Sequence, residues 1–180
     1  MYAKDEKTQH TLRDNWHDIV YDRRYVSIVM GDMEKDQGTV RSWLTDRKLY
    51  VSSSPVDDGG KLSITHYRTI KRANGYSLME LQLETGRKNQ IRVHMRHIHH
   101  PLVGDPLYGK GNERMNLYLD RQFLHSWSVS FVHPVTGEVV SCKDELPWDL
   151  AAALDELHDR SLGRTEAGEQ IIPRLGLLED

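Results

Sequence analysis

The residues most able to do chemistry are concentrated in one run, Gly86 to His100, which contains four cations and four histidines. An arginine presents a planar fork of N–H donors that suits phosphate or carboxylate groups. Cations near the start of a helix act together with free N–H groups and the helix dipole, which also favour anions. Arg87, Lys88, Arg92 and Arg96 therefore indicate a polyanion site. A solvated helix face would explain the same charges equally well, and the residues alone leave both interpretations open.

The histidines of this run offer a third chemistry, which is metal binding. Zinc takes three or four fixed nitrogen or sulfur ligands. No H-E-x-x-H motif and no cysteine pair accompanies the histidines, and the interleaved arginines would repel a divalent cation. We therefore expect no metal here, although a zinc-binding domain stays an alternative. The histidines concerned are His94, His97, His99 and His100.

Other parts of the sequence carry no conventional catalytic motif. A Gly-x-Ser-x-Gly elbow, a P-loop and a dinucleotide-binding glycine pattern are all missing. The single cysteine, Cys142, cannot form an internal disulfide. Tyr25 would by itself be a core aromatic residue at the start of a strand.

The elements that position these residues can be predicted from hydrophobic periodicity. Asn74-Gly75 separates two strand-like runs, as expected of a β-hairpin with a type I′ turn. The pattern changes to a helical one after Gly86, where Ile91, Met95 and Ile98 recur at intervals of four and three. The sequence thus predicts an α+β domain rich in strands. Its predicted helices cover residues 5–19, 88–98 and a segment from Pro147 onward, and its predicted strands cover 24–30, 38–44, 48–52, 64–71, 76–84, 123–132 and 138–143.

Composition limits the class of protein. A chain of 180 residues with 38% hydrophobic and 28% charged residues is typical of one globular domain. The N-terminus has no signal-peptide pattern, and no apolar run exceeds five residues, so we expect a cytoplasmic protein without a membrane span. The net charge of −3 is not that of a typical nucleic-acid binder, so any such binding must depend on a local basic face.

Two adjoining motifs carry a resemblance to a known family. The stretch Glu84-Thr-Gly-Arg-Lys-Asn-Gln-Ile-Arg-Val-His-Met and the following His100-Pro-Leu-Val-Gly-Asp-Pro-Leu-Tyr-Gly closely resemble the RluA/RluD-type RNA pseudouridine synthases. The family usually has Thr-His or Ser-His where this chain has Lys88-Asn89. Further matches occur in the family's order at Arg24-Tyr25-Val with Gly31, Thr65-His66-Tyr67-Arg68, Leu124-His125-Ser126 and His133-Pro134-Val-Thr-Gly.

The resemblance implies a mixed, largely antiparallel sheet flanked by helices. It also implies an enzyme that isomerises uridine to pseudouridine in structured RNA, without a metal or organic cofactor, after the base has left its stack. Tyr25 matches the tyrosine that packs on the target base, and Arg92 matches the arginine that pairs with the catalytic aspartate. Arg87, Lys88, Asn89 and Arg96 would border the RNA. The expected partner is ribosomal RNA, chiefly of the large subunit, or transfer RNA, with no membrane and no obligate protein partner.

One departure from the family pattern concerns the nucleophile. The family's aspartate lies in a His-Arg-Leu-Asp-x-x-Thr-Gly-like motif, and none of the aspartates here, including Asp5, Asp22 and Asp105, stands in such a motif. The start of the chain resembles the strand end that follows that motif. We therefore expect residues 1–157 to be the C-terminal portion of the catalytic domain, inactive alone, with Arg92 left without its carboxylate. Residues 158–180 would be a tail of uncertain order. The alternative is a non-catalytic RNA-binding or partner-binding remnant.

Overall fold

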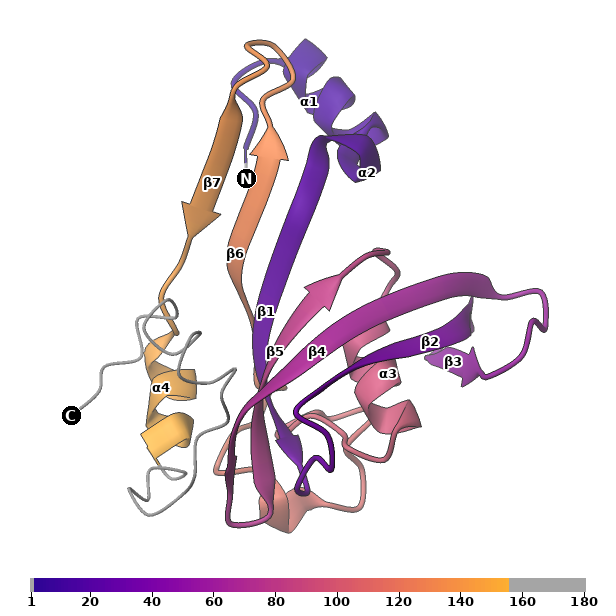
Figure 1. Cartoon of the computed structure of the whole chain (residues 1–180), viewed down its shortest axis with the longest axis vertical. Helices are drawn as coiled ribbons and strands as arrows, with labels where there is room; N and C mark the ends of the chain where they lie inside the picture. Colours follow the sequence, from indigo (N-terminus) through magenta and orange to yellow (C-terminus); the bar gives the residue numbers. More distant parts are fainter. Residues whose placement is uncertain (1, 156–180) are drawn as a thin grey trace.

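A computed structural model describes residues 2–155 of the chain. Its framework is one seven-stranded sheet in the order β3-β2-β4-β5-β1-β6-β7, and every ladder between these strands is antiparallel. Figure 1 shows that the sheet is strongly twisted, with β1, β6 and β7 extending beyond the other strands. The strands are β1 (Val20–Met30), β2 (Gln37–Asp46), β3 (Val51–Ser54), β4 (Lys61–Ala73), β5 (Tyr76–Leu83), β6 (Leu124–Val132) and β7 (Val139–Lys143).

The β4–β5 hairpin forms where the sequence predicts it. Asn74 and Gly75 both take positive φ angles, of 50° and 80°, which is the requirement of a type I′ turn. Residues Tyr76 to Leu83 then pair with both β4 and β1, so β5 lies in the middle of the sheet. A shift of register between Thr69 and Lys71 marks a bulge in β4.

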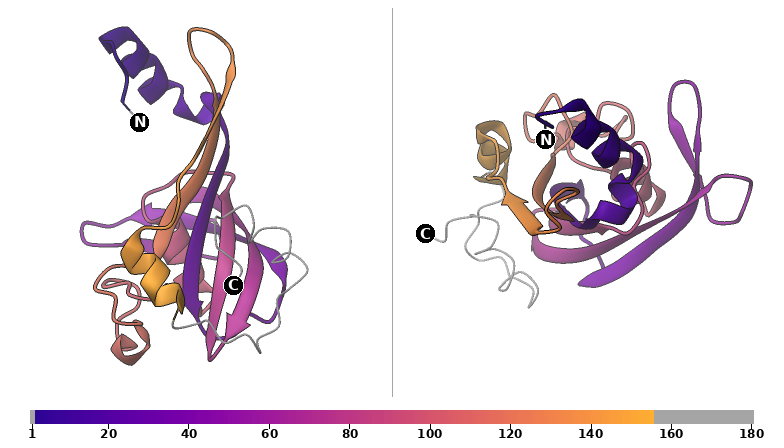
Figure 2. Two further views of the ribbon diagram at one scale, coloured as in Figure 1. Left: turned by 90° about the vertical axis from the view of Figure 1, so that its left-hand side faces the viewer. Right: turned by 90° about the horizontal axis from the view of Figure 1, so that it is seen from above.

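Two short helices precede β1, in the segment where the sequence predicts one long helix. Helix α1 (Glu6–Asp14) begins at Asp5, whose side chain accepts a hydrogen bond from the Thr8 N–H at 2.8 Å. The helix ends at Asn15, and α2 (Trp16–Ile19) follows at once. The Asn15 backbone leaves the helical region with φ −113° and ψ 19°, which breaks the predicted helix. The left view of Figure 2 shows α1 beyond the main body of the sheet, at the end where β1 begins.

Each face of the sheet has its own apolar core. Helix α3 (Gln90–His97) packs on one face through Ile91 and Met95, against Val29, Met79 and Leu81 among others. Helix α4 (Trp148–Asp155) covers the other face through Leu150 and Ala153. A short 3-10 helix, η1 (Glu113–Met115), lies in the loop between α3 and β6. Because α3 is docked by its apolar side, the turn before it is held in a fixed place beside β1 and β5.

The predicted fold class is confirmed, since the structure is an α+β domain whose sheet is antiparallel and flanked by helices. The predicted α3 was two residues longer at its start, because residues 88 and 89 belong to the turn before the helix. No helix within residues 2–155 is long and apolar enough to cross a membrane. The predicted tail, residues 158–180, lies outside the described part of the chain.

Candidate functional site

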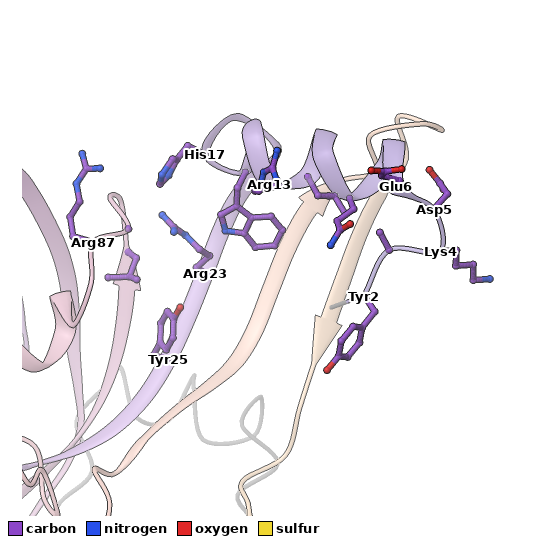
Figure 3. A pocket seen from close by; sticks show the side chains of 15 residues that line it. Tyr2, Lys4, Asp5, Glu6, Arg13, His17, Arg23, Tyr25 and Arg87 are labelled. Atoms are coloured by element: carbon purple, nitrogen blue, oxygen red, sulfur yellow. The ribbon is translucent and has the colours of Figure 1, made fainter.

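A large open cavity lies between α1, the middle of β1 and the turn before α3. Its volume is about 1120 Å³, and its lining includes Tyr25 of β1, Leu83 at the end of β5 and Arg87 in the turn before α3. In Figure 3, Tyr25, Arg23, His17 and Arg87 gather on one side of the cavity. The structure therefore brings together Tyr25 and Arg87, which the sequence analysis selected for different reasons.

Arg23 is a cavity residue that the sequence analysis missed. It lies two positions before Tyr25 on β1, and side chains two apart on a strand point to the same face. Its guanidinium rests against Gly86, where a side-chain carbon would collide with it. The same position is 3.5 Å from Cε1 of His17, an ordinary contact, so glycine at 86 makes room for the Arg23 guanidinium. The alternation of Arg23 and Tyr25 was the signal in the sequence that could have identified this residue.

The turn that carries Arg87 is fixed by a buried side chain. The Gln90 side-chain oxygen accepts hydrogen bonds from the Thr85 hydroxyl at 2.8 Å and from the Arg87 N–H at 3.1 Å. Its amide nitrogen donates to the Ile64 carbonyl at 2.9 Å. Gln90 is only 2% exposed, so these bonds are shielded from water. The Arg87 backbone is therefore anchored, and its side chain extends into the cavity.

Electrostatically, the Tyr25 side of the cavity is cationic. Neither the Arg23 nor the Arg87 side chain has an ion-pair or hydrogen-bond partner among the described residues. Two guanidinium groups beside an exposed aromatic edge can bind phosphate while the ring stacks on a flat apolar group. The arrangement thus suits a nucleotide better than a small apolar ligand.

Arg92 is not among the residues that line this cavity, and it has a carboxylate partner. Its Nε and Nη2 both bond to Asp105 at 2.7 Å, and its Nη1 donates to the Asn89 side chain at 3.2 Å. The ring of Tyr108 lies 5.1 Å from the guanidinium carbon. The expectation of an unpaired Arg92 is therefore wrong, because the loop after α3 supplies a carboxylate.

The Arg92–Asp105 pair is also well shielded from water. Arg92 is 14% exposed at its side chain, and Asp105 is fully buried. Burial by itself would raise the pKa of Asp105, but hydrogen bonds from Arg92 and from the N–H groups of Tyr108 and Leu107 outweigh it and hold the pKa below its usual value. The same hydrogen bond to Asp105 raises the pKa of Arg92. Asp105 is thus an ionised structural partner of Arg92.

The remaining predicted polyanion residues do not form one cluster. Lys88 is exposed beside Arg87 and pairs with Asp46, while Asn89 has a positive φ of 55° and bonds to Arg92. Arg96 lies in the last turn of α3, where a cation stabilises the negative end of the helix dipole. The expected stripe of free cations at the start of the helix is therefore wrong: Arg87 and Lys88 precede α3, and Arg92 lies in its first turn but is held by Asp105.

Three of the four histidines, His94, His97 and His100, contact separate partners. His94 is completely buried, with Nδ1 2.8 Å from the Thr65 hydroxyl and Nε2 3.0 Å from the Ser42 hydroxyl. His97 contacts Ser53 at 3.1 Å, and His100 contacts the Met30 carbonyl at 2.9 Å. Among the described residues, no group of three or more potential metal ligands was found.

Among the described residues, no carboxylate without a partner lies beside Tyr25. Asp5 and Glu6 line the same cavity, but both lie on the other side from Tyr25 (Figure 3), and Asp5 caps α1. The Asp22 side chain bonds to Arg24 at 2.9 Å and to Gln82 at 2.9 Å, and Asp105 is held by Arg92. A reaction that needs a carboxylate beside the Tyr25 ring would therefore have to obtain it from outside residues 2–155.

Comparisons with known proteins agree with this geometry. A family model described as RNA pseudouridylate synthase matches residues 1–97. YlyB of Bacillus subtilis, described as an uncharacterized RNA pseudouridine synthase, is 36% identical over 157 residues, covering 87% of this chain and 51% of its own length. Ribosomal large subunit pseudouridine synthase D of Nitrosomonas europaea is 34% identical over 162 residues, covering 87% and 47%. The chain thus spans about half the length of these relatives.

A solved structure shows the same fold at low sequence identity. Human RNA pseudouridylate synthase domain containing 1 superposes with a TM-score of 0.71 at 19% identity, covering 99% of this chain and 75% of its own. At that identity the likeness supports the fold only. The match of the family model extends over more than half of the chain and includes β1, with Tyr25, and the turn with Arg87. The chain therefore belongs to the RNA pseudouridylate synthase family.

Proposed function

We propose that this chain is the substrate-binding half of an enzyme that isomerises uridine to pseudouridine in structured RNA. The observation that carries the proposal is the Tyr25 cavity, in which an aromatic ring lies beside two cations without partners, Arg23 and Arg87. A flipped uridine would place its base against the ring of Tyr25 and its phosphates near the guanidinium groups. Large-subunit ribosomal RNA is the proposed substrate, since one relative is named for the large ribosomal subunit.

The chemistry requires three roles. A carboxylate breaks the bond between the base and the sugar, the base is rejoined through carbon, and a proton is removed from that carbon. Tyr25 is the proposed residue for holding the base and for assisting proton removal. The carboxylate is proposed to come from a segment that precedes Met1 in a longer protein. The two carboxylates that line the cavity, Asp5 and Glu6, lie on the side away from Tyr25, which supports this view.

Arg92 is proposed to meet the incoming carboxylate. Two of its nitrogens are already held by Asp105, so Nη1, which now donates to Asn89, is the nitrogen with capacity to exchange its partner. In this view Asp105 and Tyr108 orient the guanidinium before the carboxylate arrives. The role of Arg92 in the reaction stays a prediction.

The test uses the longer protein. The reading frame upstream of the Met1 codon is examined for a Leu-Asp-x-x-Thr-Gly-like stretch, and the protein that includes it is assayed for pseudouridine in a large-subunit rRNA transcript. Tyr25→Phe should lower the rate by about a hundredfold or more, because the hydroxyl that assists proton transfer is lost while the ring remains. Tyr50→Phe, at a half-exposed tyrosine outside the cavity, is the matched control and should keep full activity.

Each part of the proposal has its own contrary outcome. A longer protein that binds the transcript but forms no pseudouridine would favour the non-catalytic alternative. Pseudouridine formed by the 180-residue chain alone, above a mock preparation, would overturn the proposal that the carboxylate comes from elsewhere. An unaltered rate for Tyr25→Phe would remove Tyr25 from the chemistry.

A further inference from the structure

A second, smaller groove adjoins the Tyr25 cavity and shares Arg87 with it. Its volume is about 240 Å³, and it lies between the β2–β3 hairpin, the start of β4 and the turn before α3. Arg87 lines both spaces, so a ligand that extends from one to the other must pass over its guanidinium.

The rim of this groove is cationic. Lys61, Arg87 and Lys88 are all exposed, against a single lining carboxylate, Asp46. The Asp46 oxygens lie 3.0 and 3.2 Å from the Lys88 ammonium group, and both side chains are more than half exposed. An exposed pair of this kind contributes little to stability, because water and salt screen its charges. A phosphate can therefore replace the Asp46 carboxylate at Lys88 at small cost.

The groove suits the phosphodiester backbone of a nucleic acid better than it suits a base. None of its described lining residues is aromatic, so it offers no ring on which a base could stack. Its floor contains Leu44 and Val51, which are only 4% and 3% exposed. Gly59 has open space at its Cα, whereas Gly60 lies against the Thr45 hydroxyl and the Asp58 carboxylate. Lysines at the rim with an open side suit the phosphodiester chain of a nucleic acid.

We propose that this groove binds the phosphodiester backbone of the RNA next to the nucleotide held in the Tyr25 cavity, an inference that rests on the proposed function. The strand would pass from the cavity over Arg87, and a neighbouring phosphate would lie between Lys61 and Lys88. In the free protein the Asp46 carboxylate pairs with the Lys88 ammonium group, and that phosphate displaces it. The carboxylate of Asp46 therefore lowers the affinity for RNA, which makes its removal a gain-of-function test.

The first experiment removes the competing carboxylate. Binding of a single-stranded oligouridine to the 180-residue chain is measured by fluorescence anisotropy at several salt concentrations. Asp46→Asn should bind about threefold more tightly, because Lys88 no longer has to exchange a carboxylate for a phosphate. Asp36→Asn is the matched control: Asp36 also holds a cation, Arg72 at 2.8 Å, and lies outside the groove. It loses the same charge and should change the affinity much less.

The second experiment removes a cation. Lys61→Gln should weaken binding and lower the slope of log affinity against log salt by about 0.7, as expected for one lost contact to single-stranded phosphate. Lys143→Gln, at the exposed end of β7, is the control and should leave the slope unchanged. If the wild type binds oligouridine and neither Asp46→Asn nor Lys61→Gln changes the affinity, the proposed role of the groove is overturned, but the proposed function is not. A wild-type chain that binds no oligouridine at low salt overturns the proposed function together with this inference.

Discussion

Two arginines of this protein make the same contact in different surroundings. Arg92 and Arg121 each hold a carboxylate through Nε and Nη2 at 2.7–2.8 Å, with Asp105 and Asp149 as partners. Asp105 is fully buried, whereas the side chains of Arg121 and Asp149 are 41% and 25% exposed. Water can solvate the second pair when it breaks but cannot reach the first. The two pairs should therefore differ widely in their contribution to stability.

Asp105→Asn should lower the free energy of unfolding by about 3–5 kcal/mol, because it leaves a largely buried guanidinium without a counter-charge. Asp149→Asn should cost less than about 1 kcal/mol, since its partner remains hydrated. Urea unfolding followed by circular dichroism gives both values. Equal losses in the two variants would show that burial does not set the strength of the Arg92 pair.

At the same scale, the residue types of the site were predictable but their directions were not. Tyr25 and Arg87 could be selected from motifs, and the strand period could have added Arg23. The inward direction of Arg92 depends on Asp105, thirteen positions away across a loop without periodicity. Helical spacing places Arg92 on a face, but it does not tell which partner that face will meet. Only the packing of the loop decides that question.

Helix α3 is attached to the sheet by polar groups as well as by its apolar side. His94 lies between Ser42 of β2 and Thr65 of β4, and it is completely buried. Burial, together with the neighbouring charge of His97, lowers the pKa of His94 from 6.5 to about 4. The neutral ring is thus part of the folded helix–sheet contact, and a protonated ring is not.

This lowered pKa makes the stability dependent on pH. The unfolded chain binds a proton at His94 near pH 6.5, whereas the folded chain does so only near pH 4. The contribution of His94 is therefore fully present above about pH 6.5 and is lost as the pH falls toward 4, by up to about 3 kcal/mol. Urea unfolding between pH 4 and 7 would measure the loss.

His94→Gln should flatten this profile, and His10→Gln, at a half-exposed histidine of α1, should leave it as in the wild type. Should His94→Gln fail to fold, an NMR titration of the wild-type histidines gives the same answer. A His94 ring that titrates near pH 6.5 in the folded protein contradicts the argument.

For helices and strands, the accuracy of the prediction from sequence depended on the kind of signal in the sequence. The β4–β5 hairpin was predicted from Asn74-Gly75 because only a few residue pairs accept two positive φ angles. The break between α1 and α2 was not predicted, since Leu12, Trp16 and Ile19 keep helical spacing across it. An asparagine is only a weak helix breaker, so the periodic apolar residues gave the misleading signal.

For the molecule as a whole, the sheet joins two regions of unequal stability. The strands β4 and β5 have apolar core residues on both faces, in the core that α3 covers and in the core that α4 covers. Helix α1 contributes no buried residue, and α2 contacts the sheet through Trp16, whose ring centre is 6.5 Å from that of Phe131. A nine-residue helix without buried contacts has little to hold it folded. We therefore expect α1 to open locally, while the rest of the domain unfolds as a unit.

Removal of the Asp5 cap tests this division. Asp5→Ala loses the hydrogen bond to the Thr8 N–H, which is worth about 1 kcal/mol to the helix. Amide hydrogen exchange of α1 should quicken about fivefold, whereas the free energy of global unfolding should stay within about 0.5 kcal/mol of the wild type. Gln90→Ala is the contrasting variant, because it leaves buried partners unsatisfied at the turn before α3 and should lower global stability by about 1–3 kcal/mol. If Asp5→Ala lowered global stability as Gln90→Ala does, α1 would be part of the cooperative core. The cavity wall that α1 forms opposite Tyr25 would then be rigid, and RNA would have to enter without any movement of that helix.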